Sequence, residues 1–199
     1  PFDFPGKERW RNELFALGVS YEQIDYVFCT HLHIDHTGWN TTLRDGRWVP
    51  TFPNATYLFV GEEWEYWRWE QDEYIKDSVV PVVDAGQARL VGNDHVIDRW
   101  LRLEPMPGHT PGHVCVKLRT SAGEAVFSGD LMHRTVQGAE PQGASRFCYD
   151  PERAALTRRE FIERHADTDV LVLAAHFPRP GYIVRTDGSY RFVPGPTAA

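Results

Sequence analysis

Apolar runs rich in β-branched and aromatic residues recur along the chain and predict its strands. Runs of this kind, bounded by glycine, proline or polar residues, are typical of buried strands. They cover residues 24–30, 55–60, 100–106, 114–120, 124–130 and 169–175. A further run over residues 181–193 is interrupted by Asp187-Gly188, a pair that predicts a tight turn between two antiparallel strands. The chain is therefore expected to be rich in sheet.

A helix is predicted near the start of the chain, over residues 7–17. Trp10, Leu14 and Leu17 share one face at helical spacing, and Gly18 suits the position just after a helix end.

Two further helices are predicted downstream. Residues 61–80 combine aromatic and charged side chains and are expected to be helical. Asp150 and Pro151 suit the N-cap and first position of a helix that ends near His165. Strands with interspersed helices indicate a mixed α/β sandwich. Since no repeat, linker or boundary is visible, we expect one domain over residues 1–199.

Composition and charge argue against some classes of binding partner. The net charge is −7 and no long basic run exists, which argues against nucleic acid or an anionic membrane as a partner. No stretch approaches the roughly 18 apolar residues of a membrane span. Cys29, Cys115 and Cys148 lack CxxC spacing, so we expect free thiols and a cytoplasmic protein. The chain begins without Met, and we expect further sequence upstream.

Candidate metal ligands stand directly after predicted strands. They are His31, His33, Asp35 and His36 in the stretch THLHIDHTGW, then His109, Asp130 and His176. Loops leaving rigid strand ends can converge on a preformed metal site. Imidazole and carboxylate suit Zn²⁺, with Mn²⁺ and Fe²⁺ as alternatives. Seven ligands exceed the needs of one ion and suit two, especially if one carboxylate bridges them.

This arrangement resembles the signature of the metallo-β-lactamase superfamily, in order, over about residues 12–186. The resemblance implies an αβ/βα four-layer sandwich with two metal ions at one rim of the sheets. It implies that His31, His33 and His109 bind one ion, and that Asp35, His36 and His176 bind the other. It also implies that Asp130 bridges them.

The segments GHTPGH, SGD and AAHFPRPGYI are most similar to the branch of N-acyl-homoserine lactonases and methyl parathion hydrolases. The lactonases carry a catalytic tyrosine three residues after the bridging aspartate. This chain has His133 there, as parathion-type members tend to have. Family members also have β-strands before the helix that begins near Lys7, so we expect the N-terminal strands to be missing.

The predicted reaction is hydrolysis of a lactone or related ester by a hydroxide that bridges the two metal ions. Such ions lower the pKa of a shared water to about neutral. Asp35 is the expected proton shuttle and His133 a second catalytic candidate. Substrate contacts are expected from Trp39, Arg146, Phe147 and Tyr149. An organophosphate triester or aryl ester is the alternative substrate. A truncated metal-binding domain without turnover is the non-enzymatic alternative.

Several side chains have a structural interpretation beside the functional one. His113 is expected to be a structural histidine, and His95 and His165 are expected on the surface. The aromatic residues of 61–80 suit core packing, with a lid over an apolar substrate or a homodimer contact as alternatives. Residues 152–165 are expected to present a solvated helix face. Thr37 and Thr110 are candidates, with His113, for orienting the ligands.

Overall fold

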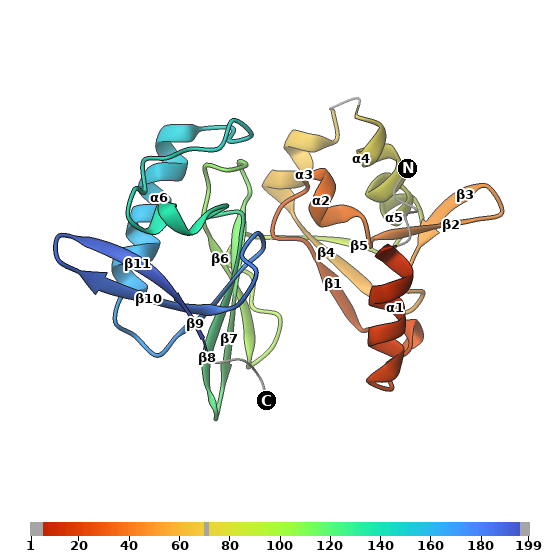
Figure 1. Ribbon diagram of the computed structural model, residues 1–199. Coiled ribbons are helices and arrows are strands. Elements are labelled where there is room, and N and C mark those ends of the chain that lie inside the picture. Colours follow the sequence, from red (N-terminus) through yellow and green to blue (C-terminus); the bar gives the residue numbers. More distant parts are fainter. Residues whose placement is uncertain (1–5, 70–71, 196–199) are drawn as a thin grey trace. The chain divides into compact units, whose positions relative to one another are not determined.

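The computed structural model describes residues 6–69 and 72–195, and it contains two compact units (Figure 1). The first unit comprises residues 1–91 and the second residues 92–199. One domain over residues 1–199 remains a prediction.

The first unit is built on a three-stranded parallel sheet of order β1-β4-β5. Its strands are β1 (Tyr26–Phe28), β4 (Thr56–Val60) and β5 (Ala88–Val91), and a separate antiparallel hairpin contains β2 (Thr41–Arg44) and β3 (Arg47–Pro50). Its helices are α1 (Gly6–Ala16), η1 (Tyr21–Gln23), α2 (Ile34–Thr37), α3 (Gly61–Trp67), α4 (Glu73–Ser78) and α5 (Val80–Asp84). The central strand β4 supplies Tyr57 and Phe59, both fully buried, to the core.

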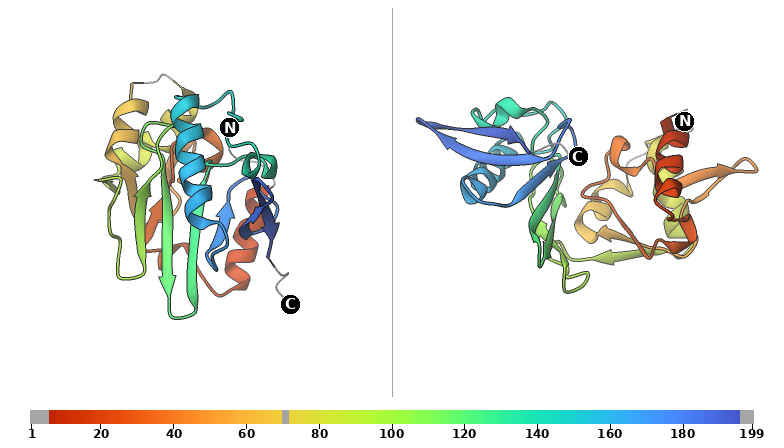
Figure 2. Two further views of the ribbon diagram at one scale, coloured as in Figure 1. Left: turned by 90° about the vertical axis from the view of Figure 1, so that its left-hand side faces the viewer. Right: turned by 60° about the horizontal axis from the view of Figure 1, so that its bottom comes forward.

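The second unit is built on a six-stranded sheet of order β11-β10-β9-β8-β7-β6. Its strands are β6 (Leu101–Pro105), β7 (Val114–Thr120), β8 (Gly123–Gly129), β9 (Leu171–Ala174), β10 (Gly181–Thr186) and β11 (Ser189–Pro194). Strands β8 and β9 pair in parallel, and the chain between them contains η2 (Thr135–Gly138) and α6 (Pro151–His165). Figure 2 shows α6 running alongside these strands. Phe161 and Ile162 of α6 pack against Val126 and Val172 of the sheet.

The predicted strands all appear, but the first differs in environment. Tyr26 in β1 is 51% exposed, because β1 lies at an edge of its sheet within the described residues. The turn at Asp187-Gly188 is confirmed, and Gly188 has a φ of 76°. The equivalent turn at Asp45-Gly46, where both residues have positive φ, joins β2 to β3 and was not predicted.

The predicted helices are confirmed in kind but not always in length or exposure. Residues 61–80 form α3, α4 and the start of α5 rather than one helix, and residues 70–71 of that range lie outside the described residues. Pro81, at the start of α5, lacks the N–H that would continue the preceding helix. In α1, Leu17 follows the last helical residue and is 80% exposed, so it does not join a buried face.

One expectation about α6 is wrong. His165 was expected on the surface, but it is 4% exposed, and its Nδ1–H donates to the Phe161 carbonyl (2.9 Å). Burial lowers the pKa of this imidazole. The helix does present the expected solvated face, where Arg159, Glu160 and Glu163 are exposed. In contrast, Arg158 is 1% exposed and donates to three backbone carbonyls. Side chains of opposite polarity therefore share the face of α6 that packs on the unit.

No helix among residues 6–69 and 72–195 combines the length and apolar character that a membrane crossing requires.

Candidate metal centre

In the first unit, the segment after β1 brings four predicted ligands together. His33 is the N-cap of α2, with extended backbone, so Asp35 and His36 fall on the first turn of that helix. The His31 ring lies 4.1 Å from the His36 ring and 4.8 Å from the His33 ring, measured between centroids. Asp35 Oδ2 lies 3.6 Å from His36 Nε2. The spacing His-x-His-x-Asp-His thus gathers its ligand atoms by local geometry.

A buried carboxylate in α3 fixes the backbone of this segment. Glu63 is 1% exposed, and its Oε1 accepts the Leu32 N–H (3.0 Å) and the Trp67 indole N–H (2.7 Å). Leu32 lies between His31 and His33, so this contact holds the backbone that carries both histidines. The His33 ring in turn lies 5.3 Å from the Trp67 ring. Sequence reasoning did not find Glu63.

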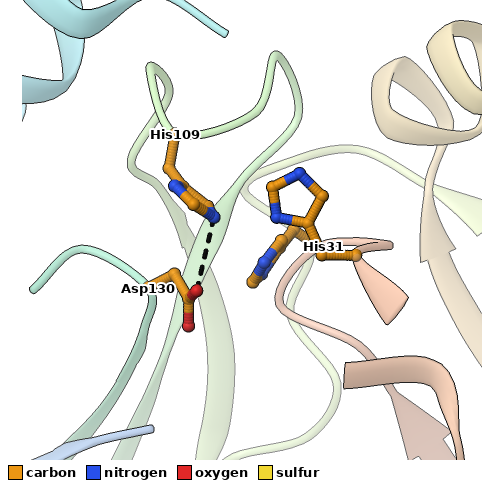
Figure 3. A group of neighbouring side chains, drawn as sticks. His31, His109 and Asp130 are labelled. Atoms are coloured by element: carbon orange, nitrogen blue, oxygen red, sulfur yellow. Dashed lines mark ion pairs between the residues drawn. The ribbon is translucent and has the colours of Figure 1, made fainter. Parts of the chain in front are cut away.

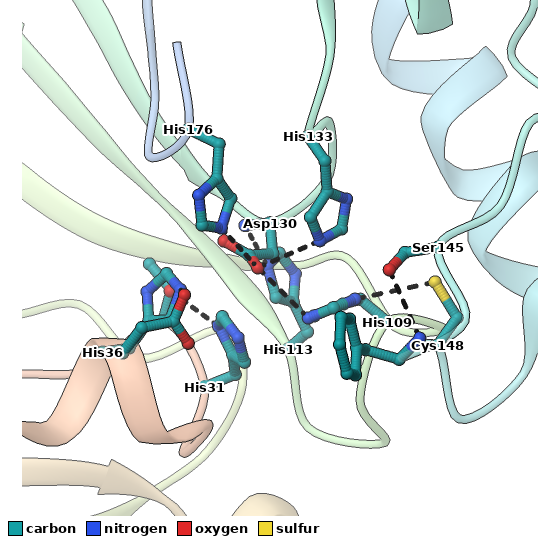
Figure 4. A network of polar contacts seen from close by, with 12 residues as sticks. His31, His36, His109, His113, Asp130, His133, Ser145, Cys148 and His176 are labelled. Atoms are coloured by element: carbon teal, nitrogen blue, oxygen red, sulfur yellow. Dashed lines mark hydrogen bonds and ion pairs between the residues drawn. The ribbon is translucent and has the colours of Figure 1, made fainter. Parts of the chain in front are cut away.

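In the second unit, three histidines surround one oxygen of Asp130 (Figure 4). Their Nε2 atoms lie 3.0 Å (His176), 3.1 Å (His133) and 3.3 Å (His109) from Asp130 Oδ2. Figure 3 shows the contact of one of them, His109, with this carboxylate. Asp130 and His109 are each 3% exposed. A single carboxylate oxygen has lone-pair sites for about two hydrogen bonds. Imidazole nitrogens close to a carboxylate oxygen are the kind of ligands that suit a divalent cation.

Strand ends position these side chains as the sequence predicted. Asp130 follows β8 directly, after Gly129 with a φ of 52°. His176 follows β9, and His109 follows β6. Parallel β8 and β9 end on the same side, and this brings Asp130 and His176 into contact.

His113 contacts the backbone of Asp130 rather than offering a ligand atom. Its Nε2 accepts the Asp130 backbone N–H (3.1 Å), and its Nδ1–H donates to the Met106 carbonyl (3.0 Å). Both ring nitrogens are thus engaged, and the imidazole is neutral in this assignment. The expectation of a structural histidine is confirmed. The Thr37 hydroxyl instead donates to the His33 carbonyl (3.4 Å), and the buried Thr110 hydroxyl has no hydrogen-bond partner among the described residues.

His133 lies in the pocket rather than on a solvated loop. Its side chain is 19% exposed and stacks on His176 with an interplanar angle of 12°. Gln137 Oε1 accepts the His133 backbone N–H (2.6 Å), which fixes the turn after Asp130. A hollow of about 280 Å³ is lined by His133, Arg134 and His176. A ligand entering this hollow would meet both imidazoles.

The predicted substrate contacts are exposed or packed on aromatic neighbours. Phe147 and Tyr149 are each 60% exposed, and the Arg146 guanidinium lies 4.8 Å above the Phe147 ring. Trp39, in the first unit, packs at 4.2 Å on Trp10 of α1. Contact of these residues with a substrate stays a prediction.

The three cysteines are free thiols. Burial raises the pKa of Cys29 to about 12 and raises that of Cys148. Cys148 Sγ lies 3.6 Å from His109 Nδ1, a contact that no sequence motif indicates.

The fold and the strand-end donors define a metal-binding α/β protein. The chain belongs to the Metallo-beta-lactamase superfamily, whose family model matches residues 3–176. It has the fold of that family, as the sequence resemblance predicted.

Known proteins similar to this chain are hydrolases. An N-acyl homoserine lactonase from a Bacillus species is 27% identical over 121 residues, which cover 61% of this chain and 43% of that protein. This chain therefore spans about two fifths of the length of such curated relatives. The crystal structure of the hydrolase AbOPH, of the beta lactamase superfamily, is 29% identical with a TM-score of 0.82, covering 95% of this chain and 70% of that one.

AidC, a dizinc quorum-quenching lactonase, has the same fold at lower identity. Its TM-score is 0.81 at 19% identity, again over 95% of this chain and 70% of that chain. A likeness at this identity is evidence for the fold alone.

Proposed function

We propose that this chain carries the dinuclear metal centre of a hydrolase that acts on a lactone or related ester. The observation that carries the proposal is the carboxylate oxygen of Asp130 with three imidazole nitrogens at 3.0, 3.1 and 3.3 Å, in a chain of this superfamily. The family pattern supports one ligand set of His31, His33 and His109, a second of Asp35, His36 and His176, and Asp130 as the bridge.

The donors fit divalent metal ions. All are imidazole or carboxylate, and His31, His109 and Asp130 are buried, which favours ligands held in one geometry. We propose two Zn²⁺, with Mn²⁺ or Fe²⁺ as alternatives. When bound, they would supply a water of lowered pKa and a Lewis acid for the substrate's carbonyl oxygen.

The remaining steps belong to the chain's own side chains. The Asp35 carboxylate is 53% exposed and lies 3.6 Å from His36 Nε2. While it is held in place, it can accept the proton that the attacking water gives up and pass it to the departing alkoxide, which leaves as an alcohol. His133 presents Nε2 beside Asp130 and lines the hollow with His176. It can donate a hydrogen bond to a substrate oxygen there.

The substrate is proposed from two kinds of support. Relatives of this chain are named N-acyl homoserine lactonases, which supports a lactone. The exposed rings of Phe147 and Tyr149 offer apolar cover for an acyl chain.

His133 supports the alternative, an organophosphate triester or aryl ester. It stands where the lactonases carry tyrosine, and its imidazole lies within 3.1 Å of Asp130. A metal-binding domain without turnover is the non-enzymatic alternative.

A side-by-side assay tests the proposal. Purified protein would be given a γ-lactone and an aryl phosphotriester, with chelator and with zinc or manganese added back. We expect metal-dependent turnover that favours the lactone. The His109→Ala variant should lose bound metal and nearly all activity, whereas His95→Ala, at a histidine outside the site, should keep both. Faster turnover of the phosphotriester would support the alternative substrate, and bound metal without any turnover would support the non-enzymatic one.

A further inference from the structure

Cys148 and Asp130 contact opposite edges of the His109 ring (Figure 4). His109 Nε2 lies 3.3 Å from Asp130 Oδ2, and His109 Nδ1 lies 3.6 Å from Cys148 Sγ. The thiol is partly buried, and it belongs to the irregular segment that precedes α6. The imidazole therefore lies between a carboxylate and a sulfur atom.

Backbone contacts hold this sulfur atom in place. The Tyr149 N–H donates to the His109 carbonyl, and the Asp150 N–H donates to the Gly108 carbonyl, both at 2.9 Å. Asp150 is also the N-cap of α6, since its side chain accepts the Arg153 N–H (2.9 Å). The segment that carries Cys148 is thus tied at one end to the helix and along its length to the loop that carries His109.

The same loop is fixed from α6 itself. The Thr157 hydroxyl donates to the Pro107 carbonyl (2.8 Å), and Gly108 adopts a φ of 128° that brings its backbone against Ala154. A ring held on so rigid a loop depends on a fixed partner for its second nitrogen, because that partner selects the tautomer.

We propose that Cys148 is a positioning residue that accepts the Nδ1–H of His109 and so reserves the Nε2 lone pair for a metal ion. This inference rests on the proposed function, in which His109 is a ligand. Partners of this kind commonly change metal affinity by 10- to 100-fold. Sulfur is a weak acceptor, so the effect should lie near the lower end of that range.

His31 shows a similar arrangement in the first unit. Its Nδ1 lies 3.1 Å from the Thr30 hydroxyl, a neutral side chain. At both histidines Nδ1 thus contacts the hydroxyl or thiol group of a neighbouring side chain.

The test compares zinc affinity, measured by competition with a coloured chelator, among Cys148 variants of the full chain. Cys148→Ala and Cys148→Val should each bind zinc about ten-fold more weakly. Cys148→Ser, which restores a hydrogen-bond acceptor, should recover most of the affinity. Ser145→Ala is the matched control, because Ser145 lies in the same segment but accepts the Phe147 N–H rather than a ligand. Circular dichroism would confirm that each variant is folded.

A second readout, ¹⁵N NMR, reports the tautomer of the His109 ring directly. In the zinc-loaded wild type, the His109 ring should show a protonated Nδ1 by ¹⁵N NMR, and this proton should exchange faster in Cys148→Val. If the wild type binds zinc and both Cys148→Ala and Cys148→Val match its zinc affinity, with Cys148→Val also matching its Nδ1 proton exchange, the role of Cys148 alone would be overturned. Absence of zinc binding by the wild type would overturn the proposed function and, with it, this inference.

Discussion

Replacing Arg158 by methionine should destabilise the second unit through the loop that follows Asp130. The Arg158 Nε–H donates to the Leu131 carbonyl (2.7 Å), and Nη1 donates to the carbonyls of Pro141 and Gly143. The guanidinium is almost fully buried, and burial lowers its pKa. Methionine keeps much of the aliphatic stem but supplies no donor.

The magnitude follows from the carbonyls left behind. Gly143 O retains a donor, the Gln137 side-chain amide at 2.6 Å, so two carbonyls lose their partner. A stranded acceptor costs about 1–3 kcal/mol where it is buried, as at Leu131, and less where it is part-buried, as at Pro141. Removing a buried cation returns part of this cost, because the guanidinium no longer has to be desolvated. We expect a net loss of about 2–4 kcal/mol in the free energy of unfolding.

Urea unfolding of the metal-free protein measures this loss. Arg159→Met is the matched control, because Arg159 is the exposed neighbour on α6 and should change stability by less than about 0.5 kcal/mol. Arg158→Lys, which keeps the charge but not the forked geometry, should fall between the two. Equal stability of Arg158→Met and Arg159→Met would refute the role assigned to the three carbonyl contacts.

Three further perturbations follow from the structure. Glu63→Leu should strand the Leu32 N–H, cost about 1–3 kcal/mol and weaken zinc binding, whereas Glu63→Gln should keep most of both in the same assays. Gly108→Ala should cost on the order of 3 kcal/mol or more by urea unfolding, because its Cβ would lie 2.3 Å from the Ala154 backbone nitrogen. Burial lowers the pKa of His165, so the wild type should lose stability as pH falls through the ordinary value of 6.5, and His165→Gln should lose less.

Each of these has a contrary result. For Glu63, equal zinc affinity of the leucine and glutamine variants would contradict the account. For Gly108, a cost no larger than that of Gly188→Ala would do so, since Gly188 shares a positive φ but has open space around it. For His165, the contrary result is a loss in the free energy of unfolding between about pH 7.5 and about pH 5.5 that is equal in His165→Gln and the wild type.

Local patterns predicted much of the fold, because apolar runs and turn residues act over a few neighbours. The hairpin at Asp187-Gly188 was predicted by its turn pair, and Asp45-Gly46 shows that the same signal was present and overlooked. The environment of α6 was not predictable in the same way. Arg158 and His165 look solvated in sequence, but their partners are backbone carbonyls that only the folded chain supplies.

The candidate ligands could be named from sequence because each follows a strand, and strand ends hold side chains in fixed directions. The residues that support them could not be. Glu63 is thirty-one positions from Leu32, and Cys148 is thirty-nine positions from His109. Neither belongs to a motif, so only tertiary packing shows the contact.

A zinc titration of the metal-free protein tests the central claim most directly, with bound zinc and γ-lactone hydrolysis measured in the same samples. We predict no turnover without metal and a rise to a plateau at two zinc ions per chain, as a dinuclear site requires. The Asp130→Ala variant should not reach that plateau. Lactone turnover that persists in excess chelator, or a protein that binds no zinc, would contradict the account.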